Sequence, residues 1–137
     1  MMVSKAKYVK NLREIPAYRV TKPEGHNRNI VLLVDKPGDG AQKISMGLCI
    51  IDPKSKIPYH AHENEEEAIY IIKGNGIAKF TDFEQKVSAG SVMFCPPKVS
   101  HQIINTGDKK LWFVIPYSPP GPEQNIKNVG TPRKSLR

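Results

Sequence analysis

Glycine and proline punctuate this chain so often that only short structural segments fit between them. The 137 residues contain 10 glycines and 12 prolines, and turn sequences that hold them recur about every 8–12 residues, as in all-β sandwiches and barrels. The segments between the turns are short apolar runs, and none has the 3.6-residue period of an amphipathic helix. This pattern predicts an all-β fold without helices, either an antiparallel barrel or a two-sheet jelly roll.

The predicted strands are the apolar runs between these turns. They cover residues 29–34, 44–51, 67–73, 77–81, 86–87, 92–95, 100–105 and 111–115. Two hairpins are predicted from the shortest connections. One joins the third strand to the fourth across residues 74–76, and the other joins the last two strands across residues 106–109.

The chain is predicted to form one domain with two distinct ends. Residues 29–118 are expected to form the β-barrel, and residues 1–28 an N-terminal arm or edge strands. Residues 119–137 form a proline-rich, basic C-terminal tail that is expected to cross the surface or fray. A chain of this length buries a sufficient core without disulfides, so Cys49 and Cys95, each in an apolar run, are predicted to be buried and reduced.

The net charge of +8 does not predict a nucleic-acid partner. The excess lies in residues 1–28 and 122–137, and no stripe of basic and aromatic residues marks a docking surface between them. The basic ends are expected instead to favour the approach of an anionic substrate. No apolar run is long enough to span a membrane, and the N-terminus lacks the features of a secretory signal, so a cytoplasmic location is predicted.

Two histidines and a run of acids carry the chemistry of this sequence. Alternate residues of a strand point to the same side, so His60 and His62 can aim two imidazoles at one point. A carboxylate from the acidic run at residues 63–67 and a third imidazole, from His101, would complete a four-ligand metal cage. The alternative is that His60 and His62 are exposed loop histidines and that His101 belongs to the core.

These residues resemble the two motifs of the cupin family, commonly written G-x5-H-x-H-x3,4-E-x6-G and G-x5-P-x-G-x2-H-x3-N. The first is matched by His60, His62, Glu67 and Gly74, but Lys54 stands at its opening glycine. The second is matched by Gly90, Pro96, His101 and Asn105, but Lys98 stands at its second glycine. The resemblance covers about residues 44–116, and the two missing glycines concern turn geometry.

The resemblance implies a jelly-roll barrel of the double-stranded β-helix type, often a homodimer, with one divalent transition metal. Its ligands would be His60, His62, Glu67 and His101, which suit iron, manganese, nickel, zinc or copper. Glu66 fits the shorter form of the spacing, and Glu63 and Glu65 are close. Two arguments favour Glu67. Only Glu67 has the six-residue gap to Gly74, and an inward Glu67 also turns Ile69 and Ile71 inward by strand alternation.

Three functions are compatible with the sequence. The first is a metal-dependent enzyme on a small organic substrate, anionic or sugar-like, by Lewis-acid isomerase or lyase chemistry or by dioxygenation. Tyr59, Glu65 and Glu66 are candidates for its proton-transfer group. Lys98 could reach an anionic substrate, although a surface role is the simpler interpretation. The second function is a metal-dependent binding or sensing module without turnover. The third is a metal-free sugar epimerase or carbohydrate-binding protein, which would not need four metal ligands.

Overall fold

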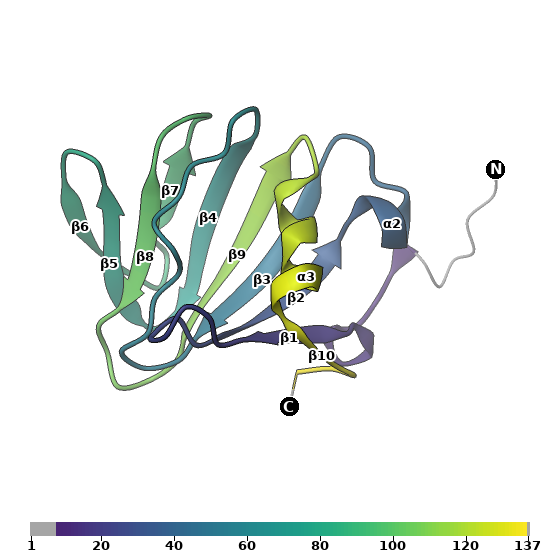
Figure 1. Ribbon diagram of the computed structural model, residues 1–137, viewed down its shortest axis with the longest axis horizontal. Coiled ribbons are helices and arrows are strands. Elements are labelled where there is room, and N and C mark those ends of the chain that lie inside the picture. The colour runs from purple at the N-terminus through teal and green to yellow at the C-terminus, as the bar shows by residue number, and fades with distance from the viewer. Residues whose placement is uncertain (1–7, 137) are drawn as a thin grey trace.

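The computed structural model describes residues 8–136, which form two packed antiparallel sheets (Figure 1). The larger sheet has the strand order β10-β1-β2-β3-β9-β4-β7, and the smaller has the order β6-β5-β8. Strands β3 and β4 lie in the same sheet but are separated by β9, which pairs with both. From β4 onward the chain passes between the sheets several times. This arrangement confirms the predicted all-β, jelly-roll fold.

The strands and helices are short. In chain order they are η1 (Leu12–Glu14), β1 (Ala17–Val20), β2 (Arg28–Val34), α2 (Lys36–Asp39), β3 (Ser45–Ile51), β4 (Glu66–Lys73), β5 (Asn75–Phe80), β6 (Glu84–Ser88), β7 (Val92–Cys95), β8 (His101–Asn105), β9 (Leu111–Ser118), η2 (Pro122–Asn125), α3 (Ile126–Val129) and β10 (Thr131–Arg133). Each of the eight predicted strands overlaps one of the strands from β2 to β9.

The core lies between the two sheets and follows from side-chain alternation along the strands. On β4, Glu67, Ile69 and Ile71 are buried, whereas Tyr70 and Ile72 on the opposite face are exposed. The buried face packs against residues of both sheets, among them Ile103 and Phe113, which are 0% exposed. This alternation also buries the carboxylate of Glu67 in an otherwise apolar face.

Neither predicted hairpin forms. β4 pairs with β7 and β9, whereas β5 pairs with β6 and β8 in the other sheet. In the same way, β8 pairs with β5 while β9 pairs with β3 and β4. The short connections at residues 74 and 106–110 are therefore corners between sheets. The prediction was wrong because a tight turn is compatible with both arrangements, and only the packing of distant strands decides between them.

Gly74 makes the first of these corners possible. Its φ of +102° lies in the left-handed region, which side chains disfavour by about 1–2 kcal/mol. A Cβ at this position would also lie 2.8 Å from the carbonyl oxygen of Lys110 and 2.9 Å from the Cα of Leu111. The start of β9 thus passes directly against the corner, and only glycine allows this approach.

Hydrogen bonds of Asn105 stabilise the second corner, at residues 106–110. This residue is 1% exposed, and its amide nitrogen lies within hydrogen-bond distance of three carbonyl oxygens, those of Ile51, Asp52 and Lys109, at 3.0, 3.0 and 2.9 Å. Its side-chain oxygen accepts a hydrogen bond from the backbone of Gly107 at 3.0 Å. One amide side chain therefore joins the ends of β3 and β8 to the turn that leads into β9.

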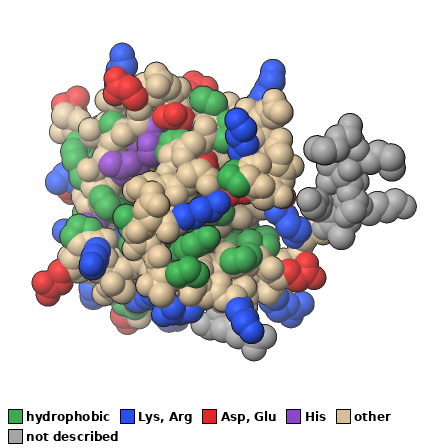
Figure 2. All heavy atoms as spheres, turned by 45° about the vertical axis from the view of Figure 1, so that its right-hand side comes forward, with side chains coloured by type: hydrophobic (Ala, Val, Ile, Leu, Met, Phe, Trp, Pro, Cys, Tyr) green, Lys and Arg blue, Asp and Glu red, His purple; other side chains and the backbone are tan. Residues whose placement is uncertain are grey.

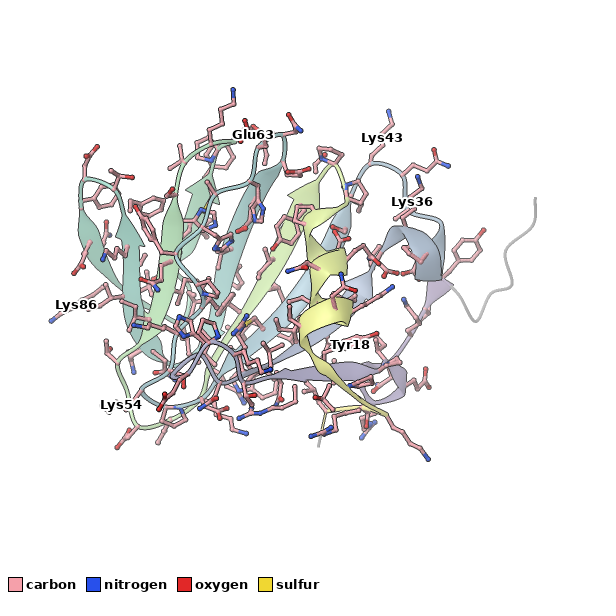
Figure 3. All side chains as sticks on the ribbon, viewed as in Figure 1. Tyr18, Lys36, Lys43, Lys54, Glu63 and Lys86 are labelled. Carbon is pink, nitrogen blue, oxygen red and sulfur yellow. The ribbon has the colours of Figure 1, made fainter. Side chains whose placement is uncertain are left out.

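The two motif positions without glycine both have left-handed backbone. Lys54 has a φ of 62° and Lys98 a φ of 71°. At Lys98 the backbone N–H donates to the carbonyl of His62 at 2.6 Å, which holds the two motif loops together. Lys54 lies at the opposite end of the molecule from Glu63 (Figure 3). The two lysines therefore preserve the turn geometry that glycine normally supplies.

The structure also contains short helices, which the turn pattern does not predict. In α2 the Asp35 side chain accepts a hydrogen bond from Gly38 N at 2.8 Å, and Gly40 ends the turn with a φ of +73°. In the sequence these residues have the composition of a simple turn, because one helical turn has no detectable period. No helix within residues 8–136 is long and apolar enough to cross a membrane.

The segment after β9 packs against the larger sheet. The predicted surface tail contains η2, α3 and β10, and β10 pairs with β1. Glu123 is only 4% exposed and accepts hydrogen bonds from Ser45 Oγ and Gly121 N. In Figure 1 the ribbon of η2 and α3 lies in front of β3 and β2, and α3 contacts β1. The tail was predicted to cross the surface or fray; within the described residues it lies on the larger sheet, where buried hydrogen bonds hold it.

The steric role of Gly74 can be tested against Gly90, which has a similar φ of +95° but no atom within 4 Å of the place that a Cβ would occupy. Gly90→Ala is expected to cost about 1 kcal/mol for the left-handed backbone. Gly74→Ala is expected to cost about 1–3 kcal/mol more, because the methyl group must displace β9. Free energies of unfolding from denaturant titration measure both changes, and equal losses would contradict a steric role.

Candidate metal centre

The backbone brings His60 and His101 side by side. His60 N donates to the carbonyl of His101 at 3.1 Å, and His101 N donates to the carbonyl of His60 at 2.8 Å. This mutual pair places the two imidazole centroids 4.5 Å apart. Two residues that are distant in the sequence thus present their side chains from one antiparallel bridge.

Hydrogen bonds fix which nitrogen of each ring faces the centre. His60 Nδ1 lies 2.7 Å from the carbonyl oxygen of Pro58, and His101 Nδ1 lies 3.0 Å from that of Val99. A carbonyl oxygen can only accept, so each Nδ1 carries a hydrogen. The Nε2 atoms are therefore the ones available to a metal, and backbone support of this kind is typical of metal-binding histidines.

Glu67 and His62 complete the cluster. The Glu67 carboxylate, 2% exposed, lies 2.9 Å from His101 Nε2 and 3.2 Å from His62 Nε2. His62 Nε2 is nevertheless buried without a hydrogen-bond partner among the described residues, because its contact with Glu67 lacks hydrogen-bond geometry. An unsatisfied buried nitrogen is costly, and coordination of an ion would satisfy it.

The electrostatics of the cluster are those of a site prepared for positive charge. Burial alone would raise the pKa of the Glu67 carboxyl, but the imidazoles of His101 and His62 lower this pKa to about 2. Burial opposes a charged ring at His101, but Cys95 and Glu67 raise its pKa to about 10. Burial lowers the pKa of His60. A proton on His101 therefore balances Glu67 when no ion does so, and ion binding would release it.

The four donor atoms fit a transition metal. One ligand atom each from His60, His62, Glu67 and His101 lies within 4.8 Å of the others. Metal–nitrogen bonds of about 2.1 Å would place opposite ligands about 4.2 Å apart, so small side-chain movements suffice. Three imidazoles and one carboxylate suit iron, manganese, nickel, zinc or copper and leave coordination positions for another molecule.

A cavity of about 430 Å³ opens onto the cluster. His60, His62 and Glu67 line it, and a group of histidine side chains is visible on the surface in Figure 2. Its remaining walls come from β2, β3, the loop between β3 and β4, β9 and the segment after β9. The apolar residues among them include Ile30, Leu32, Leu48, Ile57, Ile115 and Ile126. Three of the four clustered residues therefore line an otherwise largely apolar chamber.

The structure does not bring the predicted proton-transfer candidates into this cavity. Glu66 is exposed on the face of β4 opposite to Glu67. Tyr59 is 45% exposed and its hydroxyl pairs with Thr81 at 3.1 Å. Glu63 is exposed at the top of the molecule in Figure 3, and Glu65 does not line the cavity. Lys98 is exposed, and its side chain has no place in the cavity wall.

Four other polar residues do line the cavity: Arg28, Tyr117, Glu123 and Asn125. The Tyr117 ring lies against His62, edge to face, with centroids 5.3 Å apart, and burial raises its pKa well above the usual range. Arg28 and Tyr117 could have been found from strand alternation, since each shares its parity with inward-facing apolar residues. No sequence pattern pointed to Glu123.

The chain belongs to the cupin family. Residues 47–116 match the family model described as a cupin domain. That stretch contains all four clustered residues and the strands that carry them.

Known relatives agree with this assignment. The chain is 28% identical to Protein SchB of Streptomyces halstedii over 67% of each protein. It is 36% identical to the oxalate-binding protein of Thermotoga maritima over 47% of this chain and 53% of the relative. The crystal structure of a predicted oxalate decarboxylase from T. maritima superposes with a TM-score of 0.72 at 27% identity, over 80% of this chain and 97% of that one. The match to the oxalate-binding protein thus spans about half of that relative.

Two isosteric substitutions test which carboxylate serves the centre. The wild-type protein is expected to hold about one equivalent of a transition metal, as in single-ion sites of this donor type. Glu67→Gln should weaken binding by more than about 100-fold, since even supporting residues contribute about 10- to 100-fold. Glu66→Gln should leave metal content unchanged, because that side chain faces solvent. Elemental analysis after anaerobic reconstitution measures all three proteins, and comparable loss in both variants would contradict the assignment of Glu67.

Proposed function

We propose that this cupin is a metal-dependent enzyme that acts on a small organic molecule through an ion held by His60, His62, Glu67 and His101. The observation that carries the proposal is the convergence of these four donors, three of which line the cavity, with His62 Nε2 lacking any hydrogen-bond partner among the described residues. A divalent ion bound there supplies Lewis-acid stabilisation of negative charge on a substrate oxygen.

Two side chains in the cavity support an enzyme rather than a passive binding site. Lewis-acid isomerase and lyase reactions need a group that holds or moves a proton near the metal. The Tyr117 hydroxyl belongs to a ring in contact with His62, and the Glu123 carboxylate lines the same chamber. Tyr117 is the better placed of the two, because Glu123 already accepts hydrogen bonds from Ser45, Gly121 and Gln124.

Binding without turnover is the second candidate function. It is favoured by the 36% identity to a protein named for oxalate binding rather than for a reaction. A metal-free sugar-binding role has less support, because the full donor set would serve no purpose and the cavity walls are mainly apolar.

Substitution of Tyr117 separates these functions. A panel of 2-oxo acids and dicarboxylates that includes oxalate would be incubated with metal-loaded protein in deuterated water. We expect metal-dependent decarboxylation, isomerisation or deuterium incorporation for at least one compound, measured by NMR. Tyr117→Phe should slow this reaction about 100-fold or more, in the range of general acid–base contributions, and should retain the metal.

The matched control is Tyr70→Phe, since the Tyr70 side chain is exposed on the outer face of β4. Equal rates in wild-type and Tyr117→Phe protein would show that Tyr117 is not the proton-transfer group. Binding of panel compounds without any conversion would favour the binding module.

A further inference from the structure

Arg28 is a charged residue in the interior of the cavity. It begins β2, and the alternation of this strand turns Arg28, Ile30 and Leu32 toward the same chamber. The arginine is only 5% exposed, although arginine is almost never this buried unless it is paired. The chamber that contains the metal donors therefore also contains a buried guanidinium.

No carboxylate within residues 8–136 pairs with the guanidinium of Arg28. Its single hydrogen bond to the described residues runs from Nη1 to the carbonyl of His26, at 2.6 Å, so most of its five N–H donors remain available. No ion pair within 4.0 Å joins it to any acid in residues 8–136. By contrast, Arg19 on β1 pairs both terminal nitrogens with the Asp52 carboxylate. Arg28 thus has N–H donors that could bind a carboxylate, and no carboxylate of the described residues occupies them.

The two carboxylates that share the chamber are already committed. Glu67 contacts the imidazoles of His101 and His62. Glu123 accepts hydrogen bonds from Ser45 Oγ, Gly121 N and Gln124 Nε2. With a divalent ion at the donors, the ion and Arg28 outweigh these two negative charges. The chamber then carries a net positive charge that favours an anion.

The remaining walls define the rest of the ligand. Ile30, Leu32 and Ile115 from the larger sheet line the cavity together with Ile126 from α3. These side chains offer no hydrogen bonds to hydroxyl groups, which a sugar would need. The volume of about 430 Å³ lies in the range of pockets for drug-sized molecules, and oxalate would fill only a small part of it.

We infer that Arg28 is a carboxylate-binding residue and that this protein takes a carboxylic acid with an apolar body larger than oxalate. The inference rests on the proposed function, because three of the proposed metal ligands, His60, His62 and Glu67, line the same chamber as Arg28. Arg28 would orient the carboxylate by paired N–H donors, and the isoleucine and leucine walls would bury the apolar part.

Calorimetric titration of the zinc-loaded protein tests this inference with four probes: acetate, hexanoate, hexanamide and oxalate. Hexanoate should bind more tightly than acetate, by about fourfold for each methylene that becomes buried. It should also bind more tightly than hexanamide and oxalate. Arg28→Met should weaken hexanoate binding about 10- to 100-fold, as expected for loss of a charged hydrogen bond, and Arg28→Lys should restore part of it. Arg13→Met, at an exposed site on η1, is the control and should bind like the wild type.

Metal content and thermal unfolding of each variant are measured first, so that the outcomes can be told apart. Wild-type protein without metal would contradict the proposed function itself. Metal-loaded Arg28→Met that is folded and still binds hexanoate like the wild type would overturn the role of Arg28. Equal affinity for hexanoate and hexanamide, or for hexanoate and acetate, would overturn the ligand class while leaving the metal centre in place.

Discussion

The buried carboxylate of Glu67 is the group on which the centre of this molecule depends. It lies on the same buried face of β4 as Ile69 and Ile71, which belong to the core. An uncompensated charge there would be very costly. Compensation comes from His101 and His62, and their positions in turn require the His60–His101 bridge between the two motif loops. The burial of this one negative charge therefore depends on contacts between segments that are far apart in the sequence.

The motif spacing was sufficient to identify the members of the cluster, but it could not give their arrangement. Period-two alternation separates Glu67 from Glu66, and the structure shows the two on opposite faces of β4. Strand positions could also be predicted, because apolar runs and turns are local features. Pairing could not, since the corner at Gly74 resembles a hairpin turn until the start of β9 passes against it. Long-range packing made that choice.

The cavity wall was the least predictable part, because its residues come from segments without a motif. Arg28 lies at the boundary of the predicted arm, one residue before the apolar run that predicts β2, and its inward parity becomes visible only when the strand includes it. Glu123 lies in a polar segment and is buried through partners on β3 and the neighbouring turn. Such burial depends on where the chain returns in space, which composition does not reveal. The clustered residues thus lie within recognisable motifs, whereas wall residues such as Arg28 and Glu123 lie outside them.

This separation has a consequence for how the protein folds. All four clustered residues lie between residues 60 and 101, whereas part of the chamber wall comes from residues 122–126. Between these two segments lies β9, which joins β3 to β4 in the larger sheet. Because a domain generally folds as a unit, the larger sheet is complete only when β9 has been made. The cluster and the chamber around it therefore form in the same folding step, although their residues are far apart in the sequence.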